Sequence, residues 1–405
     1  MDDGKRIKVL YIQVPPGGGS LIALYELLKN LPETIEPVVL CYYKNEYAVM
    51  LESVSKVIYL DIAKYSFQNE KRFSKSKLIS SIQVQFQLLK DYWFNSKELR
   101  TALHNIIQKE QPNIIHHNNE IFLNRDAIRA GVKANIPQVV HERSLGNYGI
   151  NYVNLIADKL LMKKVAARVD ISKAVADHFD KLYVSTAEKK IVLYDTVDTK
   201  KYFPAPADEN LRNILGIQKN DVVITSIGRI IKWKGQHVLI EAINLLKDKL
   251  ANFKVLLVGT DDSGIGSTEY KNELQQLAAT YNLTDKIIFT GNRNDIPAII
   301  NFSDVIVHCA VKPEPQGLVV IETLLCNKPL IASGNGGSGE MVSKFGGITL
   351  DNVDAATLAA KLEDVLIRKN IPVINHAKLK RDFDAAQQLS VLTQLYREVL
   401  AQNAE

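Results

Sequence analysis

The chain has 405 residues, 46% of them hydrophobic, so it can bury a large core and exceeds the usual size of one domain. Fifty basic and 45 acidic side chains leave a formal net charge of +5, too low a charge density for a dedicated nucleic-acid-binding protein. The three cysteines, Cys41, Cys309 and Cys326, are too widely spaced for a zinc motif and too few for a disulfide framework. We therefore expect two domains in a reducing compartment, with no nucleic-acid partner.

The N-terminus, MDDGKRIKVLYIQV, passes from a short polar start directly into an apolar run, which predicts a first strand. No stretch reaches the roughly 18 uninterrupted apolar residues that a membrane span needs. No signal peptide with a cleavage site is visible either. These features predict a cytoplasmic protein.

Residues 64–94 break the regular pattern because basic side chains such as Lys71 and Arg72 alternate with aromatic ones such as Phe73 and Trp93. Aromatic residues at helical spacing favour a helical insertion that packs on its own domain. The alternative is an interfacial amphipathic helix that makes peripheral contact with anionic lipid at the inner face of the membrane. Both interpretations stay open at this point.

Short apolar runs that end at Gly, Asn or Asp alternate with segments of helical periodicity along both halves of the chain. This alternation is typical of parallel sheets covered by helices and predicts two doubly wound α/β domains. The predicted strands are residues 7–14, 37–43, 113–118, 137–142, 167–172 and 190–195 in the first half, and 222–228, 254–259, 286–291, 305–310, 329–334 and 347–351 in the second.

The stretch KKYFPAPADENLRNILG separates the two series of strands and lacks periodicity until its end, which predicts a linker at residues 197–210. The domains then span residues 1–196 and 211–381, with a ligand-binding cleft between them. A final helix at about residues 382–402 either ends the second domain or packs back across the first.

The strongest local motif is SIGRIIKWKGQHVLIEAINLLKD, in which a predicted strand ends at Gly228 and an amphipathic helix opens at Gly235. Arg229 and Lys234 lie in the short connection between strand and helix. In sheets of this class ligands bind at the carboxyl ends of the strands, where helix N-termini also favour anions. The motif therefore predicts a diphosphate site.

A second motif, VKPEPQGLVVIETLLCNKPLIAS, places Glu314 in a loop and Glu322 in the helix that follows, with seven residues between them. Carboxylates suit paired hydroxyl groups because each offers two acceptor oxygens. One glutamate could hold a sugar and the other a ribose. The N–H groups of Gly317, Leu318 and Val319 open the same helix and are expected to face the site of the basic pair.

The combination of Gly-Arg, Lys-Gly and two glutamates separated by seven residues resembles the retaining glycosyltransferases of family 4, group 1 glycosyl transferases with the two-domain GT-B fold. The resemblance spans nearly the whole chain. It implies two Rossmann-like domains facing across a cleft, with an N-terminal acceptor-binding domain and a C-terminal nucleotide-sugar-binding domain. It also implies that Arg229 and Lys234 bind the donor diphosphate, that Glu314 contacts the transferred sugar, and that Glu322 holds the ribose.

Five further site residues follow from the same resemblance. The turn PPGGGS after the first strand is similar to the glycine loop of the family, in which Gly18 and Gly19 approach the donor closely. His141, at the end of a predicted strand, matches a catalytic histidine that faces the reacting sugar and the acceptor. In FTGNRND, Arg293 and Asn294 match the loop against the nucleobase.

Two positions depart from the family pattern. Many relatives have an aromatic residue where this chain has Gln316, so this part of the donor site is expected to be more polar or shaped for another sugar. Where relatives commonly have Asn-Gly before a Val-Asp pair, this chain has Asp195 and Thr196. That change is expected to alter the backbone turn near the linker.

The resulting expectation is a retaining, metal-independent transfer from a nucleotide diphosphate sugar to a glycan, lipid-linked or small-molecule acceptor, with no cofactor beyond the donor. Preorganised positive charge near the leaving phosphate would lower the barrier. Three alternatives stay open: a nucleotide-sugar epimerase on the same fold, an NAD-dependent dehydrogenase that uses GNGGSGE, and a non-catalytic sugar-nucleotide-binding partner subunit.

Overall fold

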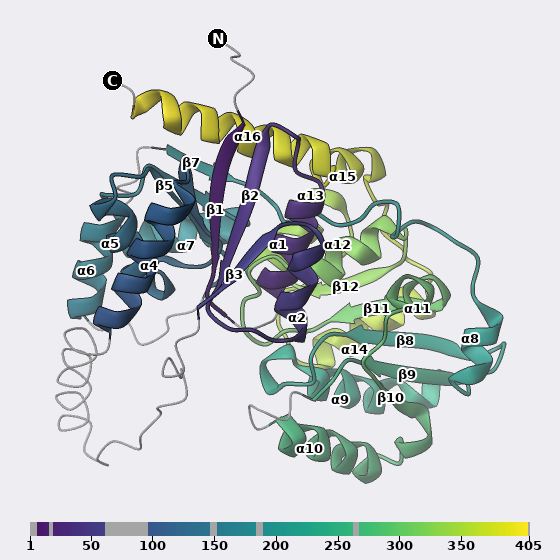
Figure 1. Ribbon diagram of the computed structural model, residues 1–405. Coiled ribbons are helices and arrows are strands. Elements are labelled where there is room, and N and C mark those ends of the chain that lie inside the picture. The colour runs from purple at the N-terminus through teal and green to yellow at the C-terminus, as the bar shows by residue number, and fades with distance from the viewer. Residues whose placement is uncertain are drawn as a thin grey trace, which may run out of the picture. The chain divides into compact units, whose positions relative to one another are not determined.

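Figure 1 shows the computed structural model, which describes residues 6–15, 19–60, 96–145, 152–183, 189–261 and 267–403. The sequence-based interpretations of residues 64–94 lie outside these ranges. The chain divides into two compact units. The first comprises Met1–Ile171, Ala176–Leu193 and Leu389–Glu405, and the second comprises Ser172–Val175 and Tyr194–Gln388. Residues 197–210, where the sequence predicts a linker, lie within the second unit.

The first unit contains a seven-stranded sheet in which every pairing is parallel. Its spatial order is β3-β2-β1-β4-β5-β6-β7, so the order reverses between β1 and β4. The strands are β1 (Ile7–Gln13), β2 (Ile35–Cys41), β3 (Lys56–Tyr59), β4 (Ile114–His117), β5 (Gln138–Glu142), β6 (Ala167–Asp170) and β7 (Lys189–Val192).

Helices cover both faces of this sheet because successive strand residues point to opposite sides. One face packs on α1 and the C-terminal helix, and the other on α4 and α5. The helices are α1 (Gly19–Lys29), α2 (Glu46–Val49), α4 (Ser96–Glu110), α5 (Arg125–Lys133), α6 (Tyr152–Met162) and α7 (Lys173–Tyr183), with 3-10 turns at Met50–Ser53 and Ile121–Leu123.

The C-terminal helix α16 (Ala385–Gln402), yellow in Figure 1, contributes its second part to the first unit. Leu389, Leu392, Tyr396 and Val399 are buried in the same cluster as strand residues such as Val9. The apolar residues recur at helical spacing, so they form one buried stripe along the helix.

The second unit contains a six-stranded, all-parallel sheet in the order β10-β9-β8-β11-β12-β13, which reverses between β8 and β11. The strands are β8 (Val222–Ile227), β9 (Phe253–Val258), β10 (Ile287–Gly291), β11 (Val305–His308), β12 (Leu330–Ser333) and β13 (Ile348–Leu350). The helices are α8 (Glu209–Ile214), α9 (Gln236–Leu246), α10 (Ser267–Thr280), α11 (Ile296–Phe302), α12 (Leu318–Leu325), α13 (Gly336–Phe345), α14 (Ala355–Leu366) and α15 (His376–Asp382), with 3-10 turns at Lys232–Lys234, Lys247–Lys249 and Thr284–Lys286.

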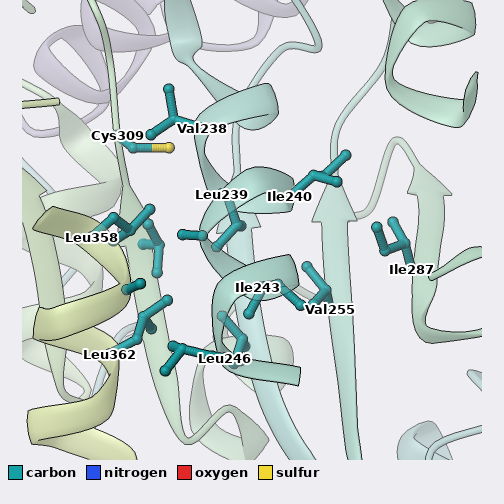
Figure 2. Packing of buried hydrophobic residues seen from close by; sticks show 14 of the residues in the cluster. Val238, Leu239, Ile240, Ile243, Leu246, Val255, Ile287, Cys309, Leu358 and Leu362 are labelled. Atoms are coloured by element: carbon teal, nitrogen blue, oxygen red, sulfur yellow. The ribbon is translucent and has the colours of Figure 1, made fainter. Parts of the chain in front are cut away.

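The core on one face of this sheet is built around α9, as Figure 2 shows. Leu239 and Ile243 project from α9 among residues of α14 such as Leu358 and strand residues such as Val255. The predicted apolar stripe of this helix is therefore the face that the sheet buries.

These two sheets confirm the α/β, doubly wound fold class and all twelve predicted strands, while β3 was missed. That strand has only four residues, starts with the exposed Lys56, and lies at the edge of its sheet. An edge strand of this length has little apolar periodicity to detect. Among the described residues, no helix combines the length and apolar character needed to cross a membrane.

A pair of leucine substitutions in α9 tests this packing. Leu239 is fully buried and Leu245, in the same helix, is 55% exposed. Leu239→Ala should lower the free energy of unfolding by about 2–5 kcal/mol, because it removes buried methyl groups and leaves a cavity. Leu245→Ala should cost less than about 1 kcal/mol. Chemical denaturation of both variants measures the difference, and equal losses would contradict the assigned packing.

Candidate functional site

The best-defined polar site of the second unit lies where the strand order reverses. β8 and β11 are neighbours in the sheet. At such a reversal, the helices that follow the two strands leave a crevice at the carboxyl ends of the strands. The loops after these two strands are tied together, since Val311 N donates to Trp233 O at 2.9 Å. Residues far apart in sequence therefore meet at this edge.

Lys234 and Glu314 form the centre of the site. The Lys234 Nζ donates to Glu314 Oε1 at 2.8 Å and to Oε2 at 2.6 Å. Both side chains are largely buried, with 15% and 13% of their surfaces exposed. The ammonium also lies 4.5 Å from the centroid of the Trp233 ring, which attracts a cation through its π face. The basic loop and the acidic loop thus form one site.

His308 is a member of this site that the sequence analysis did not identify. It is the last residue of β11, and its Nε2 lies 3.1 Å from Glu314 Oε2. Burial by itself raises the pKa of Glu314, but contacts with His308 and Lys234 outweigh it and lower the pKa to about 2. Glu314 is therefore an ionised carboxylate throughout the physiological range. A histidine at the end of a buried strand, six residues before the glutamate, was the available signal.

Two glycines allow the basic loop to adopt its shape. Gly235 has φ +75°, and a Cβ atom there would lie 1.9 Å from the backbone oxygen of Cys309. Gly228 has φ +145°, and a Cβ atom there would lie 3.8 Å from Cε of Lys234. Only glycine satisfies the first position without a backbone shift. The Gly-Arg and Lys-Gly elements of the motif thus place the loop against β11.

The loop that carries Glu314 is held by a glycine turn. Gly337 N donates to Glu314 O at 2.6 Å, and Gly336 forms an isolated parallel bridge with Glu314. A Cβ atom on Gly337 would come within 2.1 Å of Pro315 O. The sequence GNGGSGE therefore supports the Glu314 backbone by close approach of two chain segments.

Gln316 connects the loop that carries Glu314 to Asp195, the other position at which the chain departs from the family pattern. Its Oε1 accepts from Asp195 N at 2.9 Å, and its Nε2 donates to Asp195 O at 3.2 Å. Only 3% of Gln316 is exposed. The two departures thus form one hydrogen-bonded pair, in which the amide of Gln316 is used by the backbone of Asp195.

The helix after Glu314 begins as the sequence predicts. Gly317, with φ +78°, precedes the first helical residue Leu318, and Leu318 and Val319 both pack on the adjoining core. The first N–H groups of a helix have no intrahelical partner, so this end favours an anion.

Glu322 lies inside α12 and is hydrogen-bonded to Tyr202. Burial raises the pKa of Glu322 to about 7, while Tyr202 and Lys201 oppose that rise only in part. At neutral pH the carboxyl is therefore about half protonated, in contrast to Glu314. Tyr202 was assigned to the linker, where the sequence carries no signal for a contact with α12.

The remaining residues expected near a donor occupy neighbouring loops. Arg229 is exposed and follows Gly228 directly. Arg293 forms a two-pronged ion pair with Asp295, and Asn294 is exposed between them. The pairing fixes the guanidinium of Arg293 within its own loop.

The first unit has its own polar site at the reversal between β1 and β4. Gln13, at the end of β1, accepts from Asn118 Nδ2 at 2.6 Å, and the same nitrogen donates to Ser20 O at 3.0 Å. These bonds hold both flanks of the glycine turn. Gly19 is the first residue of α1, and a Cβ atom there would meet no other atom within 4 Å, whereas Gly18 lies outside the described residues.

His141 lies in a buried polar cluster of the first unit. Its Nδ1 lies 3.2 Å from Arg143 Nη2 and 3.3 Å from His116 Nε2. Arg143 Nε in turn donates to Asn118 Oδ1 at 3.1 Å, which connects the cluster to the glycine turn. The sequence analysis singled out His141 but not Arg143, because an arginine directly after a strand end carries no distinctive pattern.

The two glutamates should respond to pH with opposite signs. The pKa of Glu322 is raised to about 7, so ionisation of the unfolded state lowers the free energy of unfolding as pH rises from about 4.5 to 7. Glu322→Gln should remove that penalty. The variant should exceed the wild type by on the order of 2–3 kcal/mol at pH 8 and match it near pH 4.5.

Glu314→Gln is the matched control. The pKa of Glu314 is lowered to about 2, so its stabilising effect is complete above about pH 4.5 and is lost as pH falls through 2. This variant should be less stable than the wild type at both pH 5 and pH 8. Melting temperatures across the pH range measure both effects, and a loss of stability in Glu322→Gln at pH 8 would contradict the raised pKa.

Comparison with known proteins gives the site its context. Residues 207–382 match the family described as glycosyl transferases group 1. The spore coat protein SA of Bacillus subtilis is 24% identical over 271 residues, which cover 64% of this chain and 70% of the relative. An Escherichia coli UDP-Gal:alpha-D-GlcNAc-diphosphoundecaprenol alpha-1,3-galactosyltransferase is 25% identical over 317 residues, covering 74% of this chain and 79% of the relative.

A solved structure is similar to the chain along its length. The crystal structure of Anabaena HepE in complex with UDP aligns with a TM-score of 0.79 and 22% identity, covering 97% of this chain and 100% of HepE. At this identity the likeness establishes the fold, which is GT-B. Residues 207–382 thus match the group 1 glycosyl transferases, and the chain as a whole shares the GT-B fold.

Proposed function

We propose that this protein is a retaining, metal-independent enzyme that moves a sugar from a nucleotide diphosphate sugar to a glycan, lipid-linked or small-molecule acceptor. Its products would belong to cell-surface polysaccharides or other glycoconjugates. The observation that carries the proposal is the contact between Lys234 and Glu314 at the strand-order reversal of the group 1 glycosyltransferase domain. This contact places a cation and a carboxylate side by side at a ligand-binding edge.

Departure of a nucleotide diphosphate builds negative charge on the leaving phosphate. The Lys234 ammonium, the exposed guanidinium of Arg229 in the same loop, and the first amides of α12 at Leu318 and Val319 are suited to stabilise that charge. These groups supply positive charge that a metal ion supplies in other enzymes. They support transfer without a metal or further cofactor, which stays a proposal.

Before a donor binds, Glu314 holds Lys234 in place through both carboxylate oxygens. Diphosphate oxygens would compete for the ammonium, and the freed carboxylate oxygen would then accept hydrogen bonds from sugar hydroxyl groups. His308, which contacts Oε2 of Glu314, would keep the carboxylate in place during that exchange. The pair thus couples phosphate binding to sugar binding within one unit.

The donor and the stereochemistry rest on similarity. The E. coli relative is named for UDP-Gal, and HepE was crystallised with UDP, so UDP and its hexoses are the first donors to test. Retention of configuration follows from the resemblance to family 4, as do the roles of Glu322 toward the ribose and His141 toward the acceptor. Peripheral membrane contact through residues 64–94 also stays a prediction.

Lys234→Ala tests the centre of the proposal. Removing a cation that faces the leaving group should lower turnover by about 10²- to 10³-fold and weaken nucleotide diphosphate binding. Lys232→Ala is the matched control, because Lys232 lies in the same 3-10 turn, is 75% exposed, and pairs with Glu273. Its activity should stay within about twofold of the wild type. Steady-state kinetics and calorimetric titration measure both; unchanged turnover in Lys234→Ala would overturn the assignment.

A thermal-shift panel of UDP, GDP, ADP and CDP with their sugars identifies the donor. A ligand at about 100 times its Kd should add roughly 2.7 kcal/mol of stability, and one nucleobase series should stand out. Absence of any stabilisation at millimolar concentrations would contradict a nucleotide-sugar enzyme. Conversion of the donor sugar without acceptor would instead indicate an epimerase, and binding without transfer or hydrolysis would indicate a partner subunit.

A further inference from the structure

The buried cluster around His141 has a hydrogen-bond pattern that determines where its protons lie. His141 and His116 are at most 1% exposed, and their rings lie 5.4 Å apart in an edge-on arrangement. His116 Nδ1 lies 2.6 Å from the hydroxyl of Tyr396, which the C-terminal helix α16 carries into the first unit. A side chain near the end of the sequence is thus connected to the end of β5.

Arg143 decides the tautomer of His141. A guanidinium has N–H donors and no acceptor, so the Arg143 Nη2 that lies 3.2 Å from His141 Nδ1 must donate to it. His141 Nδ1 therefore carries no proton. The nearby His116 Nε2, at 3.3 Å, can only be a second donor to the same lone pair, and both distances are long, as expected for a shared acceptor.

The same reasoning continues to Tyr396. With a proton on Nε2, a neutral His116 has its lone pair on Nδ1, and the Tyr396 hydroxyl donates its single proton to it at 2.6 Å. In the longer contact of 3.2 Å between the two tyrosine hydroxyls, Tyr11 must then be the donor. Burial, together with the charge of Arg143, lowers the pKa of both histidines well below the usual value, so both rings are neutral. The remaining ring proton of His141 then lies on Nε2. Among the described residues, none pairs with this buried nitrogen.

We infer that Tyr396 and Arg143 are positioning residues that hold His141 in its Nε2–H tautomer and so present a hydrogen-bond donor to an oxygen of the substrate. Both act on Nδ1 of His141, Arg143 directly and Tyr396 through His116. A neutral donor of this kind suits a sugar hydroxyl or ring oxygen, which the opposite tautomer would meet with a lone pair. The role toward substrate rests on the proposed function, whereas the tautomer does not.

The tautomer is measured directly on the full chain labelled with ¹⁵N-histidine. Long-range ¹H–¹⁵N correlation spectra separate Nε2–H, Nδ1–H and doubly protonated rings, and His141→Gln and His116→Gln assign the two signals. We expect both rings to be neutral with the proton on Nε2 from pH 6 to pH 8. A proton on Nδ1 of His141, or its titration in that range, would overturn the inference whether or not sugar transfer is ever detected.

Tyr396→Phe tests the positioning role. The variant removes the donor to His116 Nδ1, so a second tautomer should appear in the histidine signals and turnover should fall about tenfold. Nucleotide diphosphate affinity should stay unchanged, because the cations expected to bind the diphosphate, Arg229 and Lys234, belong to the other unit.

Tyr11→Phe is the matched control. Tyr11 is equally buried, its hydroxyl lies 3.2 Å from that of Tyr396, and its only hydroxyl contact among the described residues is to Tyr396. The control should have a similar loss of melting temperature but retain the wild-type histidine signals and turnover within about twofold. Equal losses of turnover in both variants, or full turnover in Tyr396→Phe, would refute a positioning role for Tyr396.

Discussion

The candidate site depends on one topological constraint, the reversal of strand order between β8 and β11. Each strand is followed by a loop at its carboxyl end, and the reversal brings those two loops together without a helix between them. Lys234 and Glu314 consequently form an ion pair across 80 residues of sequence. The glycine at position 235 is required by the same arrangement, because any Cβ there would collide with the end of β11.

Within this unit the surroundings separate two carboxyl groups that look alike in sequence. Glu314 is surrounded by a lysine and a histidine, so it is ionised, and its negative charge keeps the ammonium in place. Glu322 faces a tyrosine hydroxyl in a buried environment, and its pKa is raised to about 7. Groups whose environments push their pKa values apart can serve different roles at one pH. A fixed anion beside Lys234 and a protonatable group within α12 fit that division.

The polar cluster of the first unit relies on neutral histidines rather than on charged carboxylates. His141 and His116 are too deeply buried to be charged, so their contribution is direction rather than electrostatic attraction. The orientation of the His141 N–H is set at Nδ1, by Arg143 directly and by Tyr396 of the last helix through His116. The return of α16 to the first unit is thus part of its core and of its polar cluster.

The sequence by itself determined the α/β class, all but one strand, and the loops that carry Lys234, Glu314 and His141, because apolar periodicity and strand-end motifs are local properties of the chain. It could not reveal the contacts that His308 and Gln316 make, nor the return of Tyr396 to the first unit. Those depend on which strands become neighbours and on how far each side chain is buried. Glutamate is an ionised carboxylate at position 314 and a half-protonated one at position 322, because only the folded structure sets the neighbours of each side chain and its access to water.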